Sequence, residues 1–141
     1  MVDVSVNYLA VVVCGVIYMA IGSLWYSPLL FGNYWAKMNG FDLNDKKKMA
    51  AMKNKAMAAM LVSFVTTMVT AYVLKHFITY AGAKDAATGA IGGFWAWLGF
   101  IGTTLLANSM YQQKPLKLWL VDASFYLVNL LIFGALLVAW V

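Results

Sequence analysis

Residues 56 to 74 read AMAAMLVSFVTTMVTAYVL, an uninterrupted run without charge that lies between Lys55 and Lys75. A bilayer core of about 30 Å is crossed by roughly 20 predominantly apolar residues in an α-helix. The run has about that length, and its few polar side chains are small hydroxyls and one tyrosine. It predicts a membrane-spanning helix and indicates how the other apolar stretches should be interpreted.

Three further stretches show the same character. The first lies between Asp3 and Lys37, and its helix should end near Trp25, since Pro28 disfavours helix just before it. The third lies between Asp85 and Lys114. The fourth begins after Lys117 and is interrupted by Asp122. The sequence therefore predicts an all-α membrane protein, with four transmembrane helices in a compact bundle. The expected spans are 6–26, 56–78, 86–110 and 118–140, with a basic loop at 27–55, in one domain covering 1–141.

Composition supports this assignment. The chain is 64% hydrophobic and only 11% charged, whereas a soluble domain has about 25% charged residues. Arg and Glu are both absent from the sequence, which excludes mechanisms built on the bidentate guanidinium group or on an embedded glutamate.

The lysines predict an orientation. Loops on the cytoplasmic side of a membrane are enriched in Lys and Arg. The two loops expected on one side contain Lys37, Lys46, Lys47, Lys48, Lys53, Lys55, Lys114 and Lys117. We expect these loops in the cytoplasm and both termini outside.

The segment before the second span has a distinct chemistry. Asn44 is a suitable N-cap with Asp45 in the first turn, so the helix should start before the membrane. Its basic face is a candidate contact for anionic headgroups, or it serves only to set the topology. A nucleic-acid partner is not expected, since no fold for base readout accompanies the cluster. The candidate headgroup contacts are Lys46, Lys47, Lys48, Lys53 and Lys55.

Small residues predict how the helices pack. Contact between helices in lipid depends on small side chains and on polar groups that bond across the interface. The third span has such a stripe and the second has a matching line, so we expect the two to meet, within one chain or between protomers. A homo-oligomer or a larger membrane complex is compatible with this pattern. The candidate packing residues are Gly89, Gly93, Ala96 and Thr103, and Ser63, Thr67 and Thr70.

Asp122 is the strongest functional candidate, because an ionisable group inside a span is costly in lipid and usually serves a function. Tyr126 and Asn129 follow it at helical spacing, and Thr104 and Asn108 end the preceding span. We expect these five residues to form one polar cluster. Its role is either hydrogen bonding between helices or a path for a solute or ion.

Other chemistry finds little support. His76 has no partner ligands nearby in the sequence, and Cys14 lies in an apolar run. The usual metal, phosphate and nucleophile motifs are absent from the sequence. No cofactor, metal or catalytic residue is expected, and an enzyme is the least favoured class.

Three blocks of the sequence resemble those of a known protein family. They read GSLWYSPLLFGNYW at 22–35, GFWAWLGF at 93–100 and KPLKL at 114–118. The chain resembles the small bacterial membrane proteins grouped as domain-of-unknown-function family 1761. The resemblance implies a four-helix protein of the bacterial inner membrane without an established activity, and it transfers no catalytic residues.

Two functions remain open at this point. An accessory or structural membrane component, in contact with membrane lipids, requires no residue that the sequence lacks. The alternative is a small-solute, ion or lipid-binding protein of the channel or transporter type, which would use the Asp122 cluster.

Overall fold

The structure is a computed structural model that describes residues 2–42 and 44–141. Its elements in chain order are α1 (Tyr8–Trp25), α2 (Gly32–Met38), α3 (Lys46–Tyr80), α4 (Ala86–Ala96), the π-helical turn η1 (Trp97–Gly102), α5 (Thr103–Tyr111) and α6 (Leu116–Ala139). Within the described residues, four segments are long and apolar enough to cross a membrane: α1, α3, the continuous α4–η1–α5 segment and α6. The protein is an all-α membrane bundle, as the sequence predicted.

The helices start at residues that can cap them. Asn7 accepts hydrogen bonds from Leu9 N and Ala10 N at the start of α1. Asp45 caps α3 by accepting from Lys48 N at 3.1 Å. The prediction of Asn44 as this N-cap is therefore wrong by one residue: the Asn44 N–H donates to the Asp42 side chain instead. These side chains satisfy backbone N–H groups that have no partner inside the helix.

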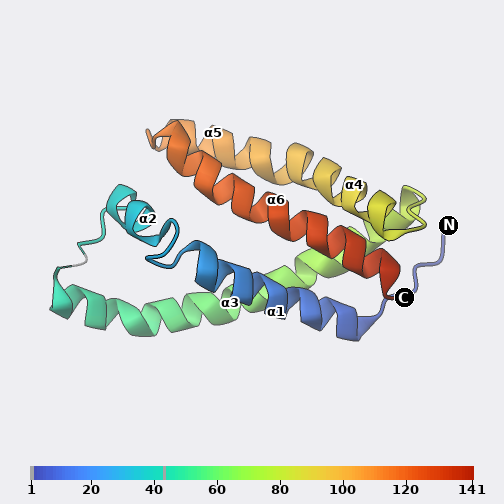
Figure 1. Cartoon of the computed structure of the whole chain (residues 1–141), viewed down its shortest axis with the longest axis horizontal. Helices are drawn as coiled ribbons and strands as arrows, with labels where there is room; N and C mark the ends of the chain where they lie inside the picture. The colour runs from blue at the N-terminus through green and yellow to red at the C-terminus, as the bar shows by residue number, and fades with distance from the viewer. Residues whose placement is uncertain (1, 43) are drawn as a thin grey trace.

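The helices form two layers (Figure 1). α4, η1 and α5 run beside α6, and α1 runs beside α3. Both chain termini lie at one end, together with the connection between α3 and α4. The opposite end holds α2, the lysine-rich start of α3 and the connection between α5 and α6. The two lysine-bearing loops therefore share one end of the bundle.

The closest helix contact is between α4 and α6. A Cβ on Gly93 would overlap the Leu130 carbonyl oxygen, and one on Gly89 would overlap that of Gly134. Gly134 in turn meets Gly89. The prediction that this stripe meets the second span is thus wrong for Gly89 and Gly93, which face α6.

The residues proposed on the second span have other surroundings. Thr67 is buried, on the stretch of α3 that packs against α1, where Gly15 contacts Phe64 and Met68. Thr70 lines a shallow apolar groove between α3 and η1, together with Ala96.

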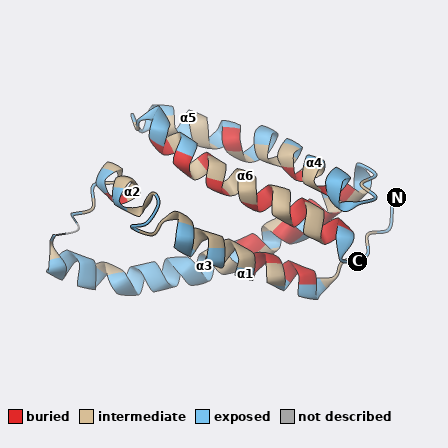
Figure 2. Ribbon diagram, in the orientation of Figure 1, coloured by how far each residue is buried: buried red, intermediate tan, exposed pale blue. Residues whose placement is uncertain are grey.

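The core lies toward the end that holds the termini (Figure 2). Buried side chains from α1, α3 and α6 meet there, and Cys14, Ile78 and Phe133 are almost completely enclosed. Cys14 is a small buried residue, as expected for a cysteine in an apolar run. The first half of α3 has almost no buried side chains. The bundle is thus tightly packed at one end and more open at the other.

The length of α3 explains this difference. It has 35 residues, which at about 1.5 Å per residue span about 52 Å. A bilayer core of about 30 Å needs far less. The helix begins at Lys46, inside the predicted loop 27–55, and its first part extends past the end of α1.

The π-helical turn is the irregular point of the third span. A π-helix forms i to i+5 hydrogen bonds and changes the faces on which the following residues lie. Gly93, before the turn, is buried against α6, whereas Thr103, after it, is exposed and its hydroxyl donates to Gly99 O. The predicted stripe therefore does not continue along one face through Thr103.

Candidate functional site

Side-chain hydrogen bonds join the end of α1 to the start of α6. The indole N–H of Trp25 donates to Val121 O at 3.0 Å. The hydroxyl of the next residue, Tyr26, donates to Asp122 Oδ1 at 2.7 Å. Neither of these bonds to α6 was predicted from the sequence.

A second indole holds the same stretch of α6. Trp97, in η1, donates from Nε1 to Ala123 O at 2.8 Å. Trp119 on α6 donates back to Gly102 O at 2.9 Å. The carbonyls on both sides of Asp122 thus receive indole N–H groups, one from α1 and one from η1. This arrangement fixes the position from which the carboxylate projects.

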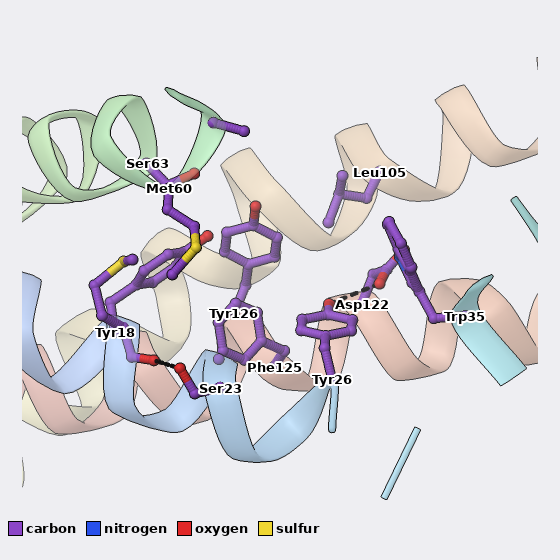
Figure 3. Close-up of a pocket in the computed structure, with 13 residues that line it drawn as sticks. Tyr18, Ser23, Tyr26, Trp35, Met60, Ser63, Leu105, Asp122, Phe125 and Tyr126 are labelled. Atoms are coloured by element: carbon purple, nitrogen blue, oxygen red, sulfur yellow. Dashed lines mark hydrogen bonds between the residues drawn. The ribbon is translucent and has the colours of Figure 1, made fainter. Parts of the chain in front are cut away.

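Asp122 lines a cavity of about 560 Å³. Figure 3 shows its carboxylate beside Tyr26 and Trp35, with Tyr126 and Leu105 also directed into the space. α1, α2, α3, α5 and α6 all contribute to the wall. The lining residues are Tyr18, Met19, Gly22, Ser23, Tyr26, Trp35, Ala59, Met60, Ser63, Leu105, Asp122, Phe125 and Tyr126.

Aromatic rings form a large part of the wall. The Phe125 ring lies at the centre of the group, 5.0 Å from Tyr18, 5.2 Å from Tyr26 and 5.4 Å from Tyr126 between centroids. Trp35 of the short helix α2 stands edge-on to Tyr26 at 5.8 Å. These rings give the cavity apolar faces with hydroxyl groups at their edges.

The wall contributed by α3 is the loosest. Ala59 and Met60 are exposed and Ser63 is half-buried. They belong to the part of α3 that leaves the packed core, so this wall can accept a larger side chain.

The polar cluster predicted from the sequence forms only in part. Asp122 and Tyr126 line the same cavity. Thr104 and Asn108 are exposed on α5, which turns Leu105 toward the cavity in their place. The prediction that the five residues share one cluster is therefore wrong. Because η1 precedes α5, regular helical spacing does not give the correct face.

Asn129 is separate from the cavity lining. Its side chain is completely buried, and Nδ2 donates to Phe125 O at 2.8 Å. Its Oδ1 has no hydrogen-bond partner among the described residues. Asn129 therefore stabilises α6 locally and does not extend the group around Asp122.

Several lining residues were not predicted as site residues. Tyr18, Gly22 and Tyr26 follow one another at four-residue steps on α1, and residues at that spacing share one helix face. This pattern was a detectable signal. The part played by Trp35 was not detectable in the same way, because it depends on how α2 folds back on α1.

The other titratable groups lie elsewhere. The His76 ring is tilted against Tyr72 and edge-on to Tyr80, and its Nδ1 contacts Tyr72 O. Lys75 is buried and donates to Leu137 O at 3.0 Å. Across residues 2–42 and 44–141, no group of three or more His, Cys, Asp or Glu could hold a metal ion.

Fold and cavity together define a multi-pass helical membrane protein with an open cavity lined by aromatic rings. The family described as "Protein of unknown function (DUF1761)" matches residues 9–138. The chain belongs to this family, which is the one that the sequence blocks suggested. Comparison with curated proteins and with solved structures gave no match.

Proposed function

We propose that this protein binds a small amphiphilic solute in the cavity beside Asp122, in the cytoplasmic membrane of a bacterium. One observation carries the proposal: a carboxylate and several hydroxyls lie on the wall of an otherwise apolar cavity of about 560 Å³. Ligand sites have this character, with mostly apolar walls, a few polar groups and volumes of about 300–1,000 Å³.

The lining chemistry favours binding over catalysis. The lining residues include no His, Cys or Lys. The acidic group accepts a hydrogen bond from Tyr26, and this contact orients the carboxylate. An apolar solute with one polar or charged group would find partners for both of its parts.

The accessory role is the second candidate, and the start of α3 supports it. This segment extends past the end of α1, and its five lysines are all exposed. Lysines near an anionic membrane surface contribute about 1 kcal/mol each. In this role the segment would contact lipid headgroups or a larger complex. In this proposal the segment lies in the cytoplasm, since cytoplasmic loops are enriched in lysine.

The headgroup contact can be tested by changing Lys46, Lys47 and Lys48 together to Gln. Native mass spectrometry of the wild type should show more retained phosphatidylglycerol than phosphatidylcholine, and the triple variant should lose this preference. Equal retention of both lipids by the wild type would exclude the contact.

Triphenylphosphine oxide tests the cavity, because it is neutral and combines three aromatic rings with one hydrogen-bond acceptor. Equilibrium dialysis in a zwitterionic detergent should show saturable binding to the wild type above the level of protein-free micelles. Ser63→Trp fills the cavity from its loosest wall and should weaken binding at least tenfold. Val62→Trp is the matched control, since Val62 is 60% exposed on the same helix and does not line the cavity. Equal binding to all three proteins would refute the proposal.

A further inference from the structure

We propose that the cavity selects organic cations: amphiphiles with an apolar body and one positive charge, held between the Asp122 carboxylate and the surrounding aromatic rings. This inference rests on the proposed function and names the chemical class of its ligand. It follows from three features of the wall, which are its charge, its rings and its location.

The first feature is the sign of the charge. The chain as a whole is strongly basic, with a formal net charge of +5. Nevertheless the only ionisable side chain among the lining residues, tyrosines aside, is Asp122. The two lysines in or next to the connection between α5 and α6 are directed to α2, where Lys114 donates to Met38 O and Lys117 lies over the Tyr34 ring. A solute in the cavity therefore meets one carboxylate and no lysine.

The second feature is the set of rings. A cation within about 6 Å of a ring centroid is attracted by the electron-rich face of the ring, and aromatic cages recognise quaternary ammonium groups in this way. Tyr18 and Tyr126, with centroids 6.3 Å apart, both lie against Phe125. Tyr26 closes the group next to the carboxylate. Rings and carboxylate together favour a diffuse positive charge on an apolar body.

The third feature is the location in a low-dielectric bundle. Asp122 is half-buried, so its carboxylate loses part of its hydration, and the single hydroxyl donor Tyr26 replaces only part of that loss. A cationic ligand would supply the missing positive charge at short range. An anionic ligand would add a second negative charge in the same poorly screened space.

Matched probes test the charge preference. Tetraphenylphosphonium and tetraphenylborate have nearly the same shape and opposite charge, so dialysis against both separates charge from size. We expect the wild type to bind the cation at least tenfold more tightly than the anion. Asp122→Asn should abolish this preference, and Asp122→Glu, which keeps the charge, should retain it.

A second pair of variants covers the case in which Asp122→Asn does not fold. Met60→Lys brings a positive charge into the cavity wall and should weaken cation binding at least tenfold. Leu61→Lys is the matched control, because Leu61 is 66% exposed and outside the lining, and it should bind the cation as the wild type does.

The outcomes separate the two proposals. Equal or tighter binding of tetraphenylborate by the wild type would overturn the cation assignment, as would a cation preference that survives in Asp122→Asn. The proposed function would stand in either case, provided that Ser63→Trp still blocks triphenylphosphine oxide. If Ser63→Trp leaves the binding of every probe unchanged, both proposals fail.

Discussion

Tyr26 and Asp122, 96 positions apart in the sequence, are joined by a hydrogen bond of 2.7 Å from the tyrosine hydroxyl to Oδ1. This bond connects the end of α1 to the start of α6, and it forms on the wall of the cavity. It therefore contributes both to the stability of the bundle and to the orientation of the carboxylate.

Tyr26→Phe removes the donor and keeps the ring. The variant should lose about 1–3 kcal/mol of unfolding free energy, since a carboxyl group of the wall loses its hydrogen-bond donor. Unfolding in mixed micelles with increasing dodecyl sulfate would measure the change. Tyr111→Phe is the control: Tyr111 is 90% exposed, and the change there should stay within about 0.5 kcal/mol. Equal stability of the two variants would contradict the hydrogen bond from Tyr26 to Asp122.

Gly93→Ala tests the contact between α4 and α6. The added methyl group would overlap the Leu130 carbonyl oxygen, and backbone cannot move aside as a flexible side chain can. We expect a loss of about 1–3 kcal/mol or more in the same unfolding assay. At Gly99 an added Cβ meets nothing within 4 Å, so Gly99→Ala should not destabilise the protein. A stable Gly93→Ala variant would show that the glycine does not face α6.

The stability of the protein should depend on pH because of Asp85, at the other end of the bundle. Its carboxylate accepts from Thr88 N at 2.8 Å and from the Thr88 hydroxyl at 2.9 Å, and these bonds lower its pKa below the ordinary value. A carboxyl group whose pKa is lower in the folded than in the unfolded protein stabilises the fold. This stabilisation is complete above the unfolded-state pKa of about 3.9 and is lost as the pH falls.

Asp85→Asn keeps a capping side chain without a titrating group, so it isolates this effect. The advantage of the wild type in thermal unfolding should be constant from about pH 7 to pH 5 and should shrink toward about pH 3. An advantage that does not change with pH would mean that the Asp85 carboxylate does not make these hydrogen bonds.

Cysteine labelling tests the proposed orientation. On a Cys14→Ala background, Lys47→Cys should not react with an impermeant thiol reagent added to intact cells. Lys84→Cys should react, because Lys84 is exposed in the connection between α3 and α4, and this connection lies at the opposite end of the bundle. The reverse pattern would place the lysine-rich end outside.

The membrane fold was predictable from the sequence because it depends on length and hydropathy, which are local properties. The long apolar runs predicted the four helices that are long enough to cross a membrane, and Asn44 and Asp45 located the start of α3 to within one residue. The partner of Gly89 and Gly93 was not predictable. A stripe of small residues permits close approach on any helix, and α6 has a single glycine, Gly134, to mark the partner.

The candidate site was predictable in its centre and not in its surroundings. Asp122 and Tyr126 stand out as polar groups in an apolar span. The π-helical turn from Trp97 to Gly102 changed the face of everything after it, which removed Thr104 and Asn108 from the site. The bond from Tyr26 depends on the packing of distant segments, which no local pattern encodes.

Tetraphenylarsonium offers the most direct test of the central claim, because it has the shape and charge of the phosphonium probe and its arsenic atom scatters anomalously. We predict one strong anomalous peak in a crystal of the complex, located beside the Asp122 carboxylate among the Tyr18, Phe125 and Tyr126 rings. A peak elsewhere on the bundle, in crystals where the cavity beside Asp122 stays empty, would contradict it.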